Sequence, residues 1–377
     1  MAKYKKRADG RYQANVSMGY DNSGKLIRKT VYARSIRDLD EKIFKLKQDT
    51  ASGIKSSDMT LYDYSVSWFK TYKAMKSINT RAMYDNIIEK HIKNSIGYIP
   101  LGAVTKSDIQ NMITERSDRR ETCNKILLTL RQIFNSAIDD DLVFKNPAKN
   151  IELPPVVKAN KRALTPQEKK AILNADFTPM QKAFIYILFY CGLRREETLA
   201  LTPSDFDFKN QTVTINKAIV FDKNTPVLSA PKNISSNRTV PIPSEAVPVL
   251  KEYVSNCKTI QLFTMKNGAV MSLSSYVKFW NSIILALNFA LFTDKQLETY
   301  KSLPKQLKKE ICPITDLTAH IFRHNYATML YYSGISIKKA AALMGHTDTK
   351  MIMQVYAHLD DEKEQTSEKI NACIKIG

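Results

Sequence analysis

The chain lacks the marks of a membrane protein, a secreted protein and a nucleotide hydrolase. It has no apolar run of about 18 residues, which argues against a transmembrane helix. Its start, MAKYKKRADG, has no apolar signal-peptide core. The five cysteines are scattered, with neither zinc-type spacing nor a disulfide framework, and no P-loop sequence occurs. We therefore expect a cytoplasmic protein with no membrane partner.

Acidic residues are also few. The chain has 57 Lys and Arg against 37 Asp and Glu, a formal net charge of +20. Such an excess favours a polyanionic partner, because cationic side chains release the counterions condensed on phosphates. Charge alone does not separate DNA from RNA or from an acidic membrane surface.

The most basic segment is the first, which we predict to be a DNA-binding domain over residues 1–55. The stretches RYQANVSMG and KLIRKTVYA alternate with a period of two around the turn DNSG, which predicts a hairpin of a three-stranded sheet. A helix over Ser35–Thr50 follows. A basic sheet can enter a major groove, although lysines also protect exposed strand edges from pairing. The candidate DNA contacts are Lys5, Arg7, Arg11, Arg28, Lys29 and Arg34.

Two further domains follow, so the predicted fold is multidomain, mainly α with small β-sheets. Residues 60–155 have the apolar stripes of a helical bundle, and Thr105 is placed to cap a helix. Residues 165–377 have a mainly helical pattern with one strand pair, formed by QTVTINKAIVF and RTVPIP. Polar or proline-containing linkers around 52–57 and 153–164 separate the three.

Four of the five histidines lie between 320 and 358, which packing alone does not explain. In LTAHIFRHNYATML, His320 and Arg323 are three residues apart and share a helix face. A guanidinium offers a planar fork of donors that suits phosphate. The alternative is a zinc site at His320 and His324, but its glutamate is missing and Arg323 would repel the cation.

Three more fragments carry groups of the same kind. In CGLRREETLAL, we expect Arg194 in the first turn of a helix, with Glu197 orienting it or forming an ordinary surface ion pair. Lys232 lies in the loop between the two predicted strands. Lys217, Lys223 and Arg238 are close by in the sequence and are alternatives to it as the site cation. In LMGHTDTKMIMQVYAH, Gly345 predicts a helix end before His346, and a bend there is needed to bring Tyr356 near His346.

Taken in order, GLRRE, Lys232, HIFRH, MGH and Tyr356 resemble the tyrosine recombinases, the relatives of phage integrases. The resemblance is strongest to integrases of conjugative transposons and Gram-positive phages, and it spans the whole chain. It implies an arm-binding domain, a helical SAM-like core-binding domain and a mixed α/β catalytic domain. It also implies a site-specific recombinase that integrates and excises a mobile element, working as a dimer or tetramer on core and arm sites of double-stranded DNA.

The resemblance assigns a role to each residue of the set. Arg194 and Arg323 would clamp the scissile phosphate, His346 would donate to a non-bridging oxygen, and Glu197 would support the arginines. Tyr356 would attack to form a 3′-phosphotyrosine, with His320 assisting its proton and Lys232 protonating the leaving 5′-oxygen. No cofactor or metal is implied. An excisionase or a host DNA-bending protein, and association with the nucleoid, are further expectations.

Two other readings remain open at this point. A type IB topoisomerase would use the same pocket to relax DNA without exchanging strands. A non-catalytic architectural DNA-binding protein would need only the charge, and the His, Arg and Tyr set would then be coincidence. The role of residues 281–315 is also left open. For the tail 366–377 we expect docking in trans on a neighbouring subunit, with packing on its own domain as the alternative.

Overall fold

The computed structural model describes residues 4–20, 26–51, 59–156, 162–230, 237–304 and 306–363. The chain divides into two compact units, Met1–Lys158 and Ala159–Gly377, and each is considered by itself. Within the described ranges, no helix combines the length and the apolar character that crossing a bilayer would require. The predicted tail role falls on residues outside these ranges.

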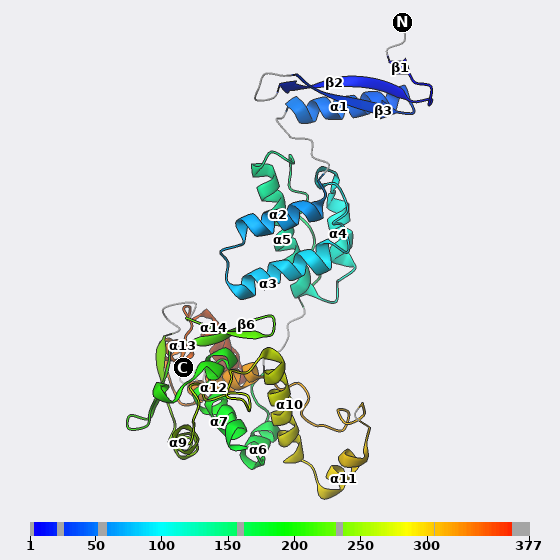
Figure 1. The fold of residues 1–377 in the computed structure, drawn as a ribbon. Helices are drawn as coiled ribbons and strands as arrows, with labels where there is room; N and C mark the ends of the chain where they lie inside the picture. Colours follow the sequence, from blue (N-terminus) through cyan, green and yellow to red (C-terminus); the bar gives the residue numbers. More distant parts are fainter. Residues whose placement is uncertain are drawn as a thin grey trace, which may run out of the picture. The chain divides into compact units, whose positions relative to one another are not determined.

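The first unit opens with the predicted three-stranded sheet, of order β1-β2-β3, and a helix packs against it (Figure 1). The elements are β1 (Lys5–Lys6), β2 (Tyr12–Tyr20), β3 (Leu26–Ala33) and α1 (Ile36–Ala51). Residues paired across an antiparallel sheet share a face. Arg28 pairs with Ser17 and Lys5 with Gln13, whereas Lys29 pairs with buried Val16. Arg28 and Lys5 therefore lie on the open face, and Lys29 lies on the side of the core.

A helical bundle completes the first unit. It consists of α2 (Leu61–Tyr72), α3 (Ile78–Asn86) with a π-helical extension (Ile87–Ile92), a 3-10 turn (Leu101–Ala103), α4 (Lys106–Thr114) and α5 (Arg120–Asp139). The predicted apolar stripes form its core, since Leu61, Trp68, Ile126 and Phe134 are all at most 2% exposed. Thr105 caps α4 in a capping box with Asp108, as predicted.

The second unit is mainly helical. Its helices are α6 (Pro166–Asn174), α7 (Pro179–Tyr186) with a π-helical end (Ile187–Cys191), α8 (Arg195–Ala200), a 3-10 turn (Pro203–Asp205), α9 (Val247–Ser255), α10 (Leu273–Phe289), α11 (Asp294–Ser302), α12 (Ala319–Tyr332), α13 (Ile337–Met344) and α14 (Lys350–Lys363). Residues 281–315, whose role the sequence left open, comprise the end of α10, α11 and the segment that follows, where Phe289, Phe292 and Tyr300 pack together.

The predicted pairing of QTVTINKAIVF with RTVPIP is confirmed for the first part of the longer run, but the unit has more strands than predicted. The run QTVTINKAIVF divides into β5 (Thr212–Ile215) and β6 (Ala218–Asp222), which belong to different sheets. β5 lies between β4 (Phe206–Asp207) and β8 (Arg238–Pro241), while β6 pairs with β7 (Thr225–Ser229). Asn216 and Lys217 interrupt the run between the two strands, and Lys217 forms an ion pair with Asp205.

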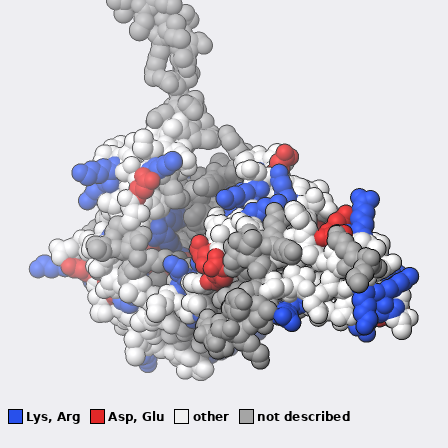
Figure 2. Space-filling view, turned by 90° about the horizontal axis from the view of Figure 1, so that it is seen from above, with Lys and Arg blue, Asp and Glu red and all other residues white. Residues whose placement is uncertain are grey.

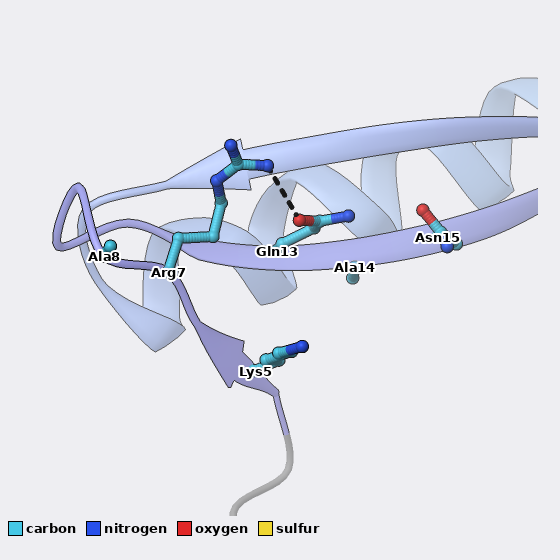
Figure 3. A pocket seen from close by; sticks show the side chains of 6 residues that line it. All are labelled: Lys5, Arg7, Ala8, Gln13, Ala14 and Asn15. Atoms are coloured by element: carbon cyan, nitrogen blue, oxygen red, sulfur yellow. Dashed lines mark hydrogen bonds between the residues drawn. The ribbon is translucent and has the colours of Figure 1, made fainter.

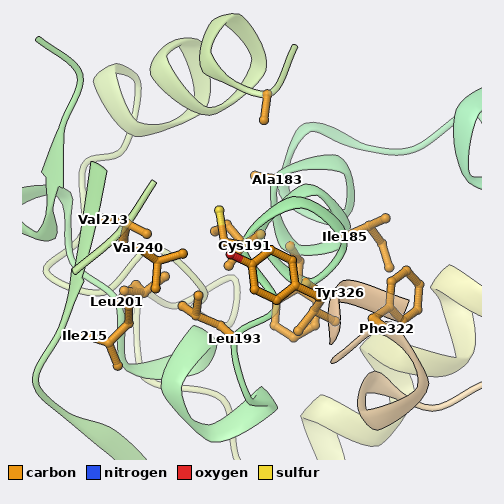
Figure 4. Close-up of a cluster of buried hydrophobic side chains, with 14 of the residues drawn as sticks. Ala183, Ile185, Cys191, Leu193, Leu201, Val213, Ile215, Val240, Phe322 and Tyr326 are labelled. Atoms are coloured by element: carbon orange, nitrogen blue, oxygen red, sulfur yellow. The ribbon is translucent and has the colours of Figure 1, made fainter. Parts of the chain in front are cut away.

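The core of the second unit packs around the end of α7. Figure 4 shows Cys191, Leu193, Val240 and Tyr326 converging there from α7, the turn after it, β8 and α12. Gly192 ends the helix with a φ of +63°, a conformation that glycine adopts without steric cost. A β-carbon at Gly192 would lie 2.2 Å from Cδ1 of Tyr326. The turn therefore requires glycine for two separate reasons.

We expect Gly192→Ala to lower the free energy of unfolding by about 3 kcal/mol or more, because backbone strain and a clash with the Tyr326 ring add together. Gly334→Ala is the matched control, since Gly334 also has a positive φ, +71°, but a β-carbon there would meet no atom within 4 Å. It should cost only the strain, about 1 to 2 kcal/mol. Thermal unfolding measures both, and equal losses would contradict the role assigned to the Tyr326 contact.

Candidate active site

Three arginines converge on the C-terminal end of α13. The last carbonyls of a helix have no partner within it and carry partial negative charge. Gly345 caps α13 with a φ of +61°, as the sequence predicted. The carbonyls of Leu343, Met344 and Gly345 accept, in that order, from Arg238 Nε at 2.7 Å, from Arg323 Nη2 and from Arg194 Nη2 at 3.3 Å. One helix end thus gathers side chains from β8, α12 and the start of α8.

Glu197 is the carboxylate at the centre of this cluster. It is 4% exposed, accepts from Arg194 Nη1 at 2.8 Å, and binds Arg238 through both oxygens at 3.0 and 2.7 Å. Burial by itself raises its pKa, but the two guanidiniums outweigh that effect and the pKa falls to about 2. Glu197 is therefore ionised at neutral pH. Arg194 is the N-cap of α8 and not, as predicted, part of its first turn.

Arg323 is the most deeply buried cation, at 2% exposed. Its Nη1 donates to the carbonyl of Gly192 at 2.9 Å, and its Nη2 donates to Met344. Burial and the nearby charge of Arg194 lower its pKa, yet a guanidinium stays protonated at neutral pH. Arg323 thus joins the two glycine turns that follow α7 and α13.

His346 lies beside Arg323 and is neutral. Its Nε2 is 3.1 Å from Arg323 Nη2, and a guanidinium has no acceptor, so Nε2 must accept and the proton must be on Nδ1. Burial, followed by the charges of Arg323, Arg194 and Arg238, lowers the pKa of His346 to about 4. Nδ1 is buried and has no hydrogen-bond partner among the described residues. It is a donor available to a bound group.

Tyr356 and His320 contact residues other than those at the end of α13. The Tyr356 hydroxyl donates to the carbonyl of Ile335 at 3.1 Å, and its ring packs edge-on against Tyr331. The residue is 6% exposed, and burial raises its pKa. His320 is exposed, and its ring contacts that of His324 at 4.6 Å; in the described part of the chain no third metal-ligating side chain joins the two.

One predicted residue lies outside the described ranges, and one residue of the cluster was not predicted. Lys232 is in the segment 231–236, so its position is not described. Arg238 was named only as an alternative to Lys232, yet its side chain is 5% exposed and it pairs with Glu197. The signal that could have identified Arg238 is its place at the start of a strand after a polar loop. A cation that the strand places in the interior needs a buried carboxylate as its partner.

The cluster has more positive than negative charge. Three guanidiniums share one carboxylate, and the imidazole is neutral, so within the described residues two positive charges are not matched by an acidic side chain in the cluster. Buried charges are normally paired because burial costs free energy. Arg194, with 34% of its side chain exposed, is the member that reaches solvent. The cluster is therefore suited to bind an anion beside Arg194, at the side of the cluster that reaches solvent.

The predicted DNA contacts of the first unit lie apart in the sequence from this cluster. Lys5, Arg7 and Gln13 line a depression of about 450 Å³ on the sheet (Figure 3). Arg7 and Arg11 each lie over the ring of Tyr32, and both contact Asp9. Arg28 and Arg34 are exposed. Figure 2 shows Lys and Arg side chains in several groups on the face drawn, with smaller groups of Asp and Glu beside some of them.

The lowered pKa of His346 predicts an acid-sensitive stability. In the unfolded chain this histidine takes up a proton near pH 6.5, but in the folded protein only near pH 4, so protons favour unfolding between these values. We expect the contribution of His346 to the free energy of unfolding to fall by about 3 kcal/mol from pH 7 to pH 4. His346→Gln should lose that part of the pH dependence in urea unfolding. His320→Gln, at an exposed histidine, is the control, and equal slopes in all three proteins would contradict the assignment.

Comparison with known proteins gives the family. The Phage integrase family model matches residues 162–363, and the model of the phage integrase N-terminal SAM-like domain matches residues 60–116. The chain is 27% identical to the "Tyrosine recombinase XerC-like" protein of Caldanaerobacter subterraneus, over 98% of this chain and 97% of that one. It is 24% identical to the ICEBs1 integrase of Bacillus subtilis, over 96% of each.

Two solved structures have the same fold. One is the Tn1549 transposon integrase in complex with a circular intermediate DNA, with a TM-score of 0.64 and 22% identity over 81% of this chain and all of that one. The other is a lambda integrase dimer bound to a core site, with a TM-score of 0.56 and 16% identity over 94% of this chain and 95% of that one. From the matched family model and these relatives, the chain belongs to the phage integrase family and is a tyrosine site-specific recombinase.

Proposed function

We propose that this recombinase cuts and rejoins DNA at the cluster on the end of α13, with Tyr356 as the nucleophile. The observation that carries the proposal is the excess of positive charge around Glu197, which a DNA phosphate would balance. Phosphoryl transfer needs in-line placement and stabilisation of negative charge on the equatorial oxygens. Two guanidiniums and a neutral imidazole that donates through Nδ1 supply that stabilisation.

Each step then has a group of this chain to perform it. Arg194 and Arg323 bind the scissile phosphate, and His346 donates to a non-bridging oxygen. The phenol oxygen of Tyr356 forms a bond to phosphorus as the bond to the 5′-oxygen breaks. The phenol proton passes toward His320, and Lys232 protonates the leaving oxygen. The phosphotyrosine bond keeps the energy needed for rejoining, so the reaction needs no nucleotide cofactor.

In the free protein the hydroxyl of Tyr356 has a hydrogen-bond partner of its own. The hydrogen bond of Tyr356 to Ile335 occupies the hydroxyl that must attack, and burial raises its pKa. Cleavage therefore requires α14 to release this hydroxyl after DNA has bound. Keeping a nucleophile apart from an assembled phosphate site limits cleavage to the DNA complex.

A nicked suicide substrate tests the chemistry. The protein should form a covalent adduct, and Tyr356→Phe should form none while it still binds DNA, because only the attacking oxygen is removed. The lost hydrogen bond to Ile335 should cost about 1 kcal/mol of stability. Adduct formation is measured by denaturing gel electrophoresis. Tyr332→Phe, at an exposed tyrosine of α12, is the control, and an adduct that persists in Tyr356→Phe would refute the assignment.

The partners and domain roles extend this proposal. Residues 1–55 bind arm-type sites, 60–155 bind core sites, and 165–377 carry out catalysis. The protein acts on cytoplasmic DNA of the nucleoid as a dimer or tetramer. An excisionase or a DNA-bending host protein is its accessory factor. Support comes from the open face of the N-terminal sheet, where Lys5, Arg7 and Arg28 accompany polar Gln13 and Asn15. Cations beside hydrogen-bonding side chains suit a DNA groove.

We expect the double change Lys5→Ala and Arg28→Ala to weaken binding of the full chain to random-sequence duplex DNA. The slope of log K against log salt should fall by about 2, because two fewer phosphates are neutralised. Fluorescence anisotropy over a salt series measures it. The matched control is the double change Arg37→Ala and Lys45→Ala on α1. An equal change of slope in both proteins would contradict contact through the sheet face.

A further inference from the structure

We propose that Arg238 is a positioning residue of the active site, which joins Glu197 to the end of α13 and so sets the spacing of Arg194 and His346. The inference rests on the proposed function and adds to it a residue to which none of the roles above was given. Arg238 does not reach the cluster by chance, since all three of its guanidinium nitrogens donate to groups that hold other members of the site.

The contacts of Arg238 connect three separate parts of the chain. Its Nη1 and Nη2 bind both oxygens of Glu197 at 3.0 and 2.7 Å, and its Nε binds the carbonyl of Leu343 at 2.7 Å. Glu197 in turn holds Arg194 through its side chain and its backbone N–H, each at 2.8 Å. The carbonyl of Leu343 lies three residues before His346. Arg238 therefore adds a second connection between Arg194 and the turn before His346, beside the direct hydrogen bond from Arg194 Nη2 to the Gly345 carbonyl.

The fit of Arg238 depends on arginine and on a nearby glycine. A guanidinium is a rigid planar fork that can bind a carboxylate with two nitrogens and a third group with Nε, which an ammonium cannot reproduce. A β-carbon at Gly345 would lie 2.8 Å from Nη1 of Arg238 and 3.2 Å from its Cδ. The turn before His346 is thus packed directly against this side chain, so a displaced Arg238 would displace the turn.

Arg238 also keeps Glu197 ionised. Four groups of the cluster face this carboxylate or its partners: Arg194, Arg238 and Arg323 as cations, and neutral His346. Arg238 is the strongest of the influences that lower the pKa of Glu197 against the effect of burial. Without Arg238, burial would raise that pKa, and a protonated Glu197 would release Arg194. Cleavage would then decline more steeply as the pH falls than it does with Arg238 present.

The test measures the rate of adduct formation on the suicide substrate, at saturating protein, from pH 5.5 to 8.5. Arg238→Lys should slow the reaction by about a hundredfold at pH 7.5, because misplaced binding groups lose orientation, while DNA affinity stays close to that of the unchanged protein at a temperature where both remain folded. Arg238→Gln should be slower still and should gain an acid limb beyond any that the unchanged protein shows. Glu197→Gln should be slow without that limb, since an amide does not titrate.

A matched control is Arg162→Lys, which alters another arginine that binds a buried glutamate, Glu168, in the same unit. Its cleavage rate and pH profile should be unchanged. If the unchanged protein forms no adduct, the proposed function fails and the inference falls with it. If it forms the adduct and Arg238→Lys is equally fast, the positioning role is refuted and the function stands. If Arg238→Gln does not fold, Arg238→Lys is combined with Glu197→Gln, and rate losses that simply multiply in the double variant refute the link through Glu197.

Discussion

The second unit depends on one arrangement, the capture of a helix end by cations. The last three carbonyls of the turn at Leu343–Gly345 each accept a hydrogen bond from a different arginine. Helix C-termini attract positive charge, and these carbonyls would otherwise be buried without partners. The same contacts that satisfy the helix end also fix the guanidiniums in space. The hydrogen bonds that stabilise this helix end therefore also assemble the site.

This arrangement leaves the cluster with more positive than negative charge. Glu197 balances only part of the charge, and His346 stays neutral because burial and the three neighbouring guanidiniums disfavour its charged form. Holding like charges together without a matching carboxylate costs free energy, which the phosphate of the proposed DNA complex would offset.

In the proposed mechanism, assembly of the anion site and placement of Tyr356 are separate events. The arginines are already fixed by backbone carbonyls, whereas Tyr356 donates to Ile335 and packs on Tyr331. Under the proposed mechanism, the Tyr356 hydroxyl would have to leave the Ile335 carbonyl before it could attack a phosphate.

Much of the fold was readable from local pattern. The period of two around DNSG, the stripes of α2 and α5, the cap at Thr105 and the helix end at Gly345 follow from interactions between residues close in sequence. The split of QTVTINKAIVF into two strands of different sheets was not readable. A continuous run of strand-forming residues has the same composition whether it pairs with one partner or two, and the choice depends on β7 and β8.

The sequence by itself determined the chemical inventory and its order, from Arg194 through Arg323 to Tyr356, because residue types and spacings are local properties. Only the tertiary structure decided how these groups are partnered. The pairing of Arg238 with Glu197, the link from Arg323 to Gly192 and the contact of Tyr356 with Ile335 join residues far apart in the chain. Such contacts arise from packing of whole elements, which fixes distances that no sequence spacing encodes.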